Sequence, residues 1–188
     1  MKNLKFILLS ISILLLTIIK SYSLIEVDIT RGNLNPLPLA VSPLSIDDES
    51  KKRFEKLLKK KNIGDEISMI VENNLRTSGL FNPLNKDAFL QAPDIANLKP
   101  RFEDWNLIKA QALITGKVTN VEDKLRVEFR LWDVLAGKEM MALAFTTVPT
   151  NWRRVGHIIS DKVYERLTGE KGYFDTRIIY VAEDGKQI

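Results

Sequence analysis

The stretch from Gln111 to Val148 constrains the fold most, because three runs of alternating apolar and polar residues follow one another there. A repeat of two residues is typical of a β-strand with one buried face. One face of the middle strand must therefore be covered, while the other can meet water. The middle run places Leu125, Val127, Phe129 and Leu131 on one face and Arg126, Glu128 and Arg130 on the other.

The outer runs extend from Ala112 to Val118 and from Met140 to Thr147. Turn-forming residues separate the runs, Glu122-Asp123 first and then Leu135-Ala136-Gly137, where Gly137 can take a positive φ. This order predicts an antiparallel meander, and its apolar face requires helices to cover it. The expected fold class is α/β (α+β), with a mixed, largely antiparallel sheet covered by two main helices.

Two segments have the spacing of those helices. The first is expected from about Asp65 to Ser78, stopped by Gly79, and the second from near Asn151 to Gly169 with Thr150 or Asn151 as its N-cap. Their core-facing stripes are Ile67, Ile70, Val71, Asn74 and Leu75 in the first, and Trp152, Val155, Ile159, Val163 and Leu167 in the second.

The segments between these elements have weaker patterns. Leu37 to Val41 is expected to be a short strand at an edge or strand end, because Pro36 and Pro43 enclose it. Phe81 to Leu84 is expected to turn the chain sharply, and Asn85 to Lys99 to be a surface loop with little structure. Phe102 to Ile108 is predicted to form a brief helix that brings Trp105 to the core.

Lysines and arginines are dense between Ser45 and Asn62. Phe54, Leu57 and Leu58 have helical spacing inside this run, so it is interpreted as an amphipathic helix with a solvated basic face. The alternative, a patch that binds nucleic acid or anionic membrane, is disfavoured because no aromatic side chains are interleaved for base stacking. The basic residues are Lys51, Lys52, Arg53, Lys59, Lys60 and Lys61.

The N-terminus has the pattern of a secretory signal peptide. Lys2 and Lys5 precede an apolar run from Phe6 to Ile19, and Ser21 and Ser23 occupy the positions that a signal peptidase reads. Cleavage is expected between Ser23 and Leu24. An uncleaved membrane anchor is the less favoured alternative, because the apolar run is shorter than the roughly 20 residues that span a bilayer.

Removal of this leader would lower the net charge of the chain from +4 to +1, because its three lysines are not balanced by any acid. The basic character of the whole chain therefore does not indicate a nucleic-acid partner. The absence of cysteine excludes disulfides, thiolate nucleophiles and metal sites built on thiolates.

Two terminal segments are interpreted by their strand patterns. Leu24 to Thr30 alternates, and the pattern alone favours the first strand of the domain's own sheet over an exposed terminus that adds to a partner. Near the other end, Ile178 to Val181 is a predicted strand, and Glu183 to Lys186 has hairpin-turn chemistry with no second strand after it. The chain is therefore expected to be cut short.

The sequence predicts no catalytic, metal or cofactor site. His157 is the single histidine, and its place on the second helix favours a structural role. The adjacent acids fall at turns or helix starts, where acids serve capping. Gly116-Lys117 lacks the remaining residues of a phosphate-binding loop.

Several motifs in order resemble the TolB family. They are Ser78-Gly79-Leu80-Phe81-Asn82-Pro83-Leu84, Thr115-Gly116-Lys117-Val118, and the run from Gly156-His157 through Ser160-Asp161-Lys162-Val163-Tyr164-Glu165 to Leu167-Thr168-Gly169. They continue through Lys171-Gly172, Phe174 and Thr176-Arg177-Ile178, and Ile29, Gly32, Pro38 and Pro43 keep the family's spacing. The resemblance covers essentially the whole mature chain.

The resemblance implies a non-enzymatic periplasmic adaptor of the Tol-Pal system, in which an N-terminal α/β domain is joined to a β-propeller. Such an adaptor links TolA to the lipoprotein Pal and supports outer-membrane integrity and constriction at cell division. Pal binding is expected only where the propeller is present. The mature N-terminus contacts the C-terminal domain of TolA, which maps to Leu24, Ile25, Glu26, Val27, Asp28, Ile29, Thr30, Arg31 and Gly32. This implication reverses the preference that the pattern alone gave for that segment.

The expected domains are a signal peptide at residues 1–23, a TolB-like N-terminal domain at 24–172, and a linker with the first strand of a truncated propeller at 173–188. Some residues depart from the family pattern: Lys51 to Lys61 is extra length, and Lys109 and Gln111 replace an expected glycine and acid. A free-standing secreted α/β ligand-binding domain, or a non-functional fragment, is the alternative.

Overall fold

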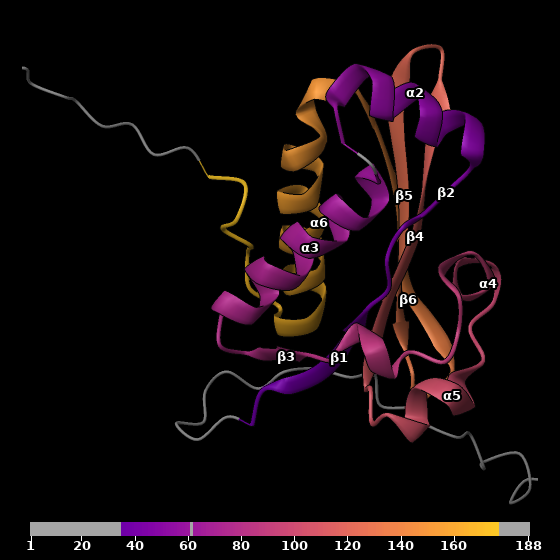
Figure 1. Ribbon diagram of the computed structural model, residues 1–188. Helices are drawn as coiled ribbons and strands as arrows, with labels where there is room; N and C mark the ends of the chain where they lie inside the picture. The colour runs from indigo at the N-terminus through magenta and orange to yellow at the C-terminus, as the bar shows by residue number, and fades with distance from the viewer. Residues whose placement is uncertain (1–34, 61, 177–188) are drawn as a thin grey trace, which may run out of the picture.

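A mixed sheet of six strands forms the centre of the part of the chain that the computed structural model describes, residues 35–60 and 62–176 (Figure 1). The strands lie in the order β3-β1-β4-β5-β6, and β2 pairs with β4 further along that strand than β1 does. The strands are β1 Leu37–Val41, β2 Ser45–Ile46, β3 Phe81–Pro83, β4 Ala112–Val121, β5 Lys124–Asp133 and β6 Lys138–Thr147. The helices are α2 Asp48–Leu58, α3 Ile63–Thr77, α4 Pro93–Leu98, α5 Phe102–Leu107 and α6 Trp152–Thr168, with short 3-10 helices η1 Lys86–Ala88 and η2 Pro149–Asn151.

The antiparallel meander is confirmed as β4, β5 and β6, each ten residues long. Glu122 and Asp123 both have positive φ, 48° and 60°, which is the backbone of a two-residue type I′ hairpin turn. Gly137 has φ 63° in the second turn, as its position predicts. The predicted inner face of β5 is buried, with Leu125, Val127, Phe129 and Leu131 at most 1% exposed.

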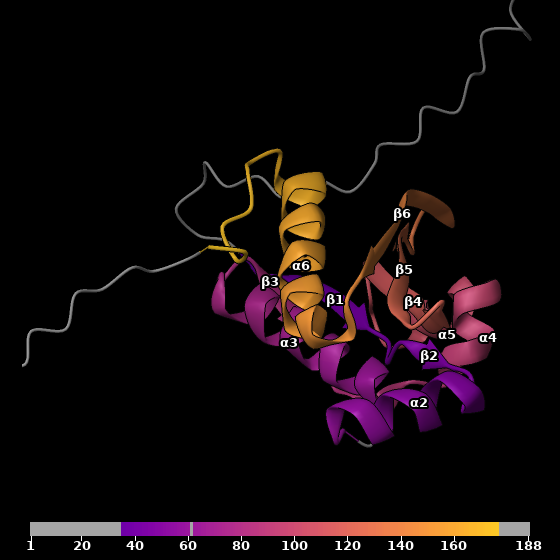
Figure 2. The same cartoon turned by 90° about the horizontal axis from the view of Figure 1, so that it is seen from above.

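Two helices cover this inner face, as predicted. Figure 2 shows α3 and α6 on one side of the sheet and the short helices α4 and α5 on the other. The apolar stripe of α6 is buried at every expected position, and the stripe of α3 is buried at Ile67, Val71 and Leu75. These side chains and the inner face of β5 form one continuous core. The mixed α/β fold class is therefore confirmed.

The segment from Asn85 to Lys99 is not the predicted unstructured loop, since it contains η1 and α4. It covers the outer face of the sheet beside α5, where a second, smaller cluster is buried. The carbonyl oxygen of the Gln91 side chain accepts hydrogen bonds from the Trp105 indole (2.7 Å) and the Arg101 backbone (3.0 Å). The residues that form these contacts are separated in the sequence, so the polar composition of the segment gave no sign of them. The cluster consists of Ala40, Ala96, Trp105, Ala110, Leu113 and Val134.

The predicted strand from Leu37 to Val41 is confirmed as β1, with Pro36 and Pro43 beyond its ends, but its expected edge position and the expected turn after α3 were wrong. β1 lies inside the sheet, because it pairs in parallel with β3 on one side and β4 on the other. Phe81 to Pro83 is the strand β3 rather than a sharp turn, and Leu37 pairs with Phe81. The edge-strand character that proline indicates belongs to β3, where Pro83 lies at the sheet's edge.

Helix α2 is amphipathic as predicted, but its apolar stripe is only partly buried. Phe54 is 1% exposed, whereas Leu57 is 55% exposed, so one aromatic side chain anchors the helix. The Asp47 side chain caps the helix by accepting hydrogen bonds from the backbone N–H (2.8 Å) and hydroxyl (2.9 Å) of Ser50. By contrast, Asn151 stands at the N-cap position of α6 without making a side-chain cap bond.

Replacing Asp47 with alanine is expected to lower the free energy of unfolding by about 1 kcal/mol at pH 7, the usual worth of an N-cap. The hydrogen bond from the Ser50 backbone holds the pKa of the Asp47 carboxyl below its ordinary value. Its contribution is therefore complete above about pH 3.9, the unfolded pKa, and is lost as pH falls through the lower folded pKa. Denaturant titrations of both proteins at pH 7 and at pH 2.5 measure this difference.

Asp48→Ala is the matched control, because Asp48 is an exposed acid of the same first turn that does not occupy the N-cap position. It should change the stability by only a few tenths of a kcal/mol. Equal losses in the two variants would contradict a capping role for Asp47.

Candidate functional site

The predicted partner-binding residues, Leu24 to Gly32, and the predicted cleavage site between Ser23 and Leu24 lie outside the described residues. The predicted propeller strand, Ile178 to Val181, also lies outside them. The structure instead describes the places where these two segments join the domain, at Asn35 and at Thr176.

The first strand and the residues that follow α6 are connected through one aromatic cluster. Leu37, at the start of β1, pairs with Phe81 of β3. The Phe81 ring contacts the edge of Tyr164 in α6, with ring centroids 6.1 Å apart. Tyr164 in turn contacts Tyr173 (5.5 Å) and Phe174 (5.8 Å), which follow α6. We call Phe81, Tyr164, Tyr173 and Phe174 the aromatic junction, and through it the first strand of the described domain is in contact with its last residues.

After α6 the chain turns back and runs alongside the helix (Figure 1). One carboxylate fastens it there: Asp161 accepts hydrogen bonds from the backbone N–H groups of Phe174 (2.6 Å) and Asp175 (3.1 Å). The Arg154 guanidinium binds the Asp175 carboxylate with both oxygens 3.1 Å from Nε. A Cβ at Gly172 would lie 2.4 Å from the Asp161 Cα, so only glycine fits this close approach.

The residues of the aromatic junction have a structural role. Tyr164 and Phe174 are partly buried against the main core. Burial raises the pKa of the Tyr164 hydroxyl, and the neighbouring Tyr173 and Glu170 raise it further. The hydroxyl is therefore protonated at neutral pH, so this group does not act as a base.

His157 joins the two main helices, in agreement with its predicted structural role. The Asn74 amide nitrogen of α3 lies 2.9 Å from His157 Nδ1 and also donates to the Ser160 hydroxyl at 2.9 Å. The helices approach closely at Gly156, where a Cβ would come within 2.8 Å of Ile70. The helical spacing that put Asn74 on the core-facing stripe was the sequence signal for this polar contact.

Among residues 35–60 and 62–176, no group of three or more His, Asp or Glu side chains is placed to hold a metal ion. In the same residues no helix is both long enough and apolar enough to cross a membrane. The basic residues of α2 lie on its solvated face, where Arg53 forms an ion pair with Asp123. Lys60, in the segment after α2, forms an ion pair with Glu66.

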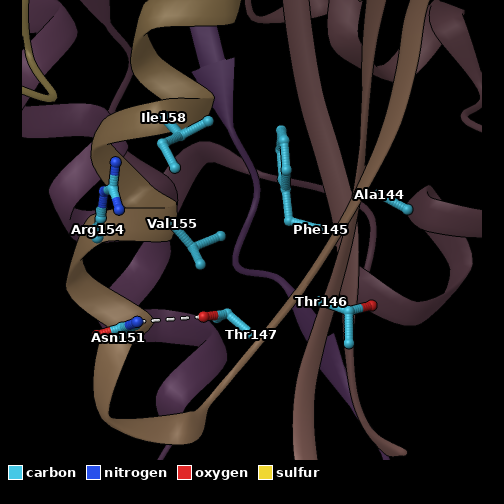
Figure 3. Close-up of a pocket in the computed structure, with 8 residues that line it drawn as sticks. All are labelled: Ala144, Phe145, Thr146, Thr147, Asn151, Arg154, Val155 and Ile158. Atoms are coloured by element: carbon cyan, nitrogen blue, oxygen red, sulfur yellow. Dashed lines mark hydrogen bonds between the residues drawn. The ribbon is translucent and has the colours of Figure 1, made fainter.

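A groove of about 310 Å³ lies between β6 and α6 (Figure 3). Phe145 points from β6 towards Val155 and Ile158 of α6, so this part of the wall is apolar. Asn151 and Arg154 line it too, and the Asn151 amide donates to the Thr147 hydroxyl at 3.3 Å. The sequence pattern predicted the strand from Met140 to Thr147 but gave no sign that the helix would leave its inner face partly uncovered.

Replacing Asp161 with alanine is expected to release the segment from Phe174 to Asp175 while the core remains folded. Hydrogen bonds to a charged acceptor are worth about 1.5–3 kcal/mol each, so exchange of these two backbone amides should accelerate at least tenfold. Hydrogen–deuterium exchange of the two amides, compared with amides of β5, measures the effect.

Glu165→Ala is the control, because Glu165 is an exposed acid of the same helix whose bonds go to Lys162. It should leave exchange at Phe174 and Asp175 unchanged. If Asp161→Ala also left their exchange unchanged, the carboxylate would not be what fastens this segment.

Known proteins resemble the chain in sequence and in fold. The family model of the TolB amino-terminal domain matches residues 25–140. The Tol-Pal system protein TolB of Pelagibacter ubique (strain HTCC1062) is 82% identical over 167 residues, which are 89% of this chain. The chain spans only 37% of that relative's length. The crystal structure of TolB from Acinetobacter baumannii matches with a TM-score of 0.60 at 22% identity, over 80% of this chain and 33% of that one, which shows the shared fold.

Proposed function

Because the chain belongs to the TolB amino-terminal domain family, we propose that it is an adaptor of the Tol-Pal system in the periplasm. The observation that carries this proposal is the 82% identity to a Tol-Pal system protein over 89% of the chain. Family membership also confirms the expectation that the domain is not an enzyme. In this role the protein would support outer-membrane integrity and constriction at cell division.

The proposed contact with the C-terminal domain of TolA is the segment from Leu24 to Gly32. Ile25, Val27 and Ile29 alternate with polar residues, so the segment can add as an extended strand to a sheet edge of its partner. Its connection to the domain supports this role, since the segment leads directly into β1, which lies inside the sheet. A force applied to the segment would therefore act on β1, a strand in the interior of the sheet.

The proposed domain organisation has the export signal at residues 1–23, the adaptor domain at 24–172, and a linker with the first propeller strand at 173–188. Support for the second boundary comes from Gly172, which lies against Asp161 immediately before the fastened segment. Contact with Pal is assigned to the propeller. The aromatic junction would then lie between the TolA-binding segment and the second domain.

The test is a calorimetric titration of the TolA C-terminal domain with two forms of the protein, one beginning at Leu24 and one at Pro36. The longer form is expected to bind, and the shorter form to lose binding while keeping the same circular dichroism spectrum. Val27→Asp in the longer form should weaken binding about tenfold, because it places a charge in the apolar face of the added strand.

Thr30→Asp is the control, because Thr30 belongs to the polar face of that strand. This substitution should alter TolA binding less than Val27→Asp does. Equal binding by the two lengths would place the TolA contact elsewhere on the domain. Absence of binding by both would favour the alternative, a ligand-binding domain, which would show itself as thermal stabilisation by a small molecule.

A further inference from the structure

Strand β6 is a long free edge of the sheet. In the described part of the chain it pairs only with β5, so the backbone N–H and C=O groups of its other side are open to a further strand. Natural edge strands are usually protected by charges, prolines or short length. From Met140 to Val148 this edge has neither a charge nor a proline. The opposite edge, β3, has three residues and ends in Pro83.

One end of β6 is already blocked. A bulge interrupts its register with β5 near Met140, whose carbonyl accepts a hydrogen bond from Arg166 at 3.4 Å. The run from Met141 to Thr147 pairs regularly with β5 and has no such obstruction. A segment of seven residues is long enough to pair with an extended peptide.

The inner groove would receive alternate side chains of such a peptide. Met141, Leu143 and Phe145 point to the inner face, and Leu143 is 37% exposed. A strand beside β6 would direct every second side chain into the space between Phe145 and Ile158 (Figure 3). Phe145, Val155 and Ile158 form an apolar wall at this place, so apolar side chains fit it best.

A second groove, of about 190 Å³, lies on the opposite face of the same strand. Its floor is Ala142 and Ala144, which are short enough for a neighbouring side chain to reach across them to β5. Across Ala142 lies Arg130, and across Thr146 lies Arg126, whereas Glu128 lies across Ala144. Arg126 forms an ion pair with Glu128. Arg130 forms one with Glu139 and also donates to the backbone carbonyl (3.2 Å) and the side-chain oxygen (3.3 Å) of Asn97. Each guanidinium has five N–H donors, so some remain for a further acid.

We propose that β6 is a docking site for an extended peptide of a partner protein, with apolar side chains facing α6 and acidic side chains facing Arg126 and Arg130. Charge complementarity selects this occupant over a second copy of the chain, since β6 itself has no acid from Met140 to Thr147. The site is separate from the segment that the proposed function assigns to TolA.

The chain's own Ile25 to Thr30 has a similar alternation, but it is the less suitable occupant. A strand beside β6 is four strand positions from β1, about 19 Å. Residues between Thr30 and Leu37 would have to cross the end of the sheet at about three quarters of full extension, since seven peptide units reach at most about 25 Å. A separate peptide has no such constraint.

The probe is the blocked heptapeptide Thr-Glu-Ile-Thr-Ile-Glu-Ile, with a fluorescent label, titrated into the protein that begins at Leu24. We expect saturable binding and slower hydrogen exchange of β6 amides between Met141 and Thr147, which apolar contact without strand pairing would not cause. The same peptide with lysine in place of both glutamates should bind at least about fivefold more weakly, because it meets the two arginines with like charge.

Paired variants test each face of the strand. Ile158→Asp should weaken peptide binding about tenfold, because it charges the inner groove. Met69→Asp, at an apolar position of α3 that is 51% exposed, should have no effect. Arg126→Glu should weaken the binding of the acidic peptide and strengthen the binding of the lysine peptide. Arg53→Glu, at another exposed arginine in an ion pair, should alter neither.

The following results of the peptide experiments would overturn the proposal. No binding, binding without protection of β6, or equal binding of the acidic and lysine peptides would exclude the site. Tighter peptide binding after removal of residues 24–34 would identify the chain's own segment as the occupant. Protection of β6 that rises with protein concentration, together with dimers in sedimentation, would identify a second copy. Loss of TolA binding with the peptide data intact would overturn only the proposed function.

Discussion

The apolar face of β5 is the constraint on which the rest of the fold depends. Four large side chains at alternate positions, Leu125 to Leu131, are at most 1% exposed. A strand with such a face is stable only when helices lie against it, and α3 and α6 supply that cover. The two helices are themselves joined by the bond between Asn74 and Ser160 and by the close approach at Gly156. The position of α6 therefore follows from that of α3, and the chain after α6 is held by Arg154, Asp161 and Tyr164 of α6.

The consequence for function lies at the two ends of the domain. β1 enters beside β3, and Phe81 connects that pair to Tyr164 of α6. The Asp161 carboxylate then holds the returning chain against the same helix. The segments proposed to contact TolA and to begin the second domain are thus linked through contacts between a few side chains.

Sequence reasoning succeeded where the controlling contacts are local or periodic. The alternation around Leu125 identified the meander, and helical spacing identified α3, α6 and the delivery of Trp105 to the core. It failed where placement depends on partners distant in the chain. The pattern of β1 predicted an edge strand because nothing local shows that β3 pairs with its outer side. The polar segment from Asn85 to Lys99 predicted a loop because nothing local shows that Gln91 accepts a hydrogen bond from Trp105. The predicted contact residues lie outside the described part of the chain, so that prediction remains a prediction.

The partly covered inner face of β6 follows from the geometry of the layers. Neighbouring helices lie about 8–10 Å apart and neighbouring strands about 4.8 Å apart, so two helices cover about four strands. The main path of this sheet has five strands, and α3 and α6 cover the inner face from β3 to β5. The fifth strand therefore has an inner face that is only partly covered, at Leu143 and Phe145. An evolving surface can add charges to such an edge or keep it for pairing. The run from Met141 to Thr147 lacks the charges and prolines that usually protect an edge, and this is the feature on which the proposed docking of a peptide rests.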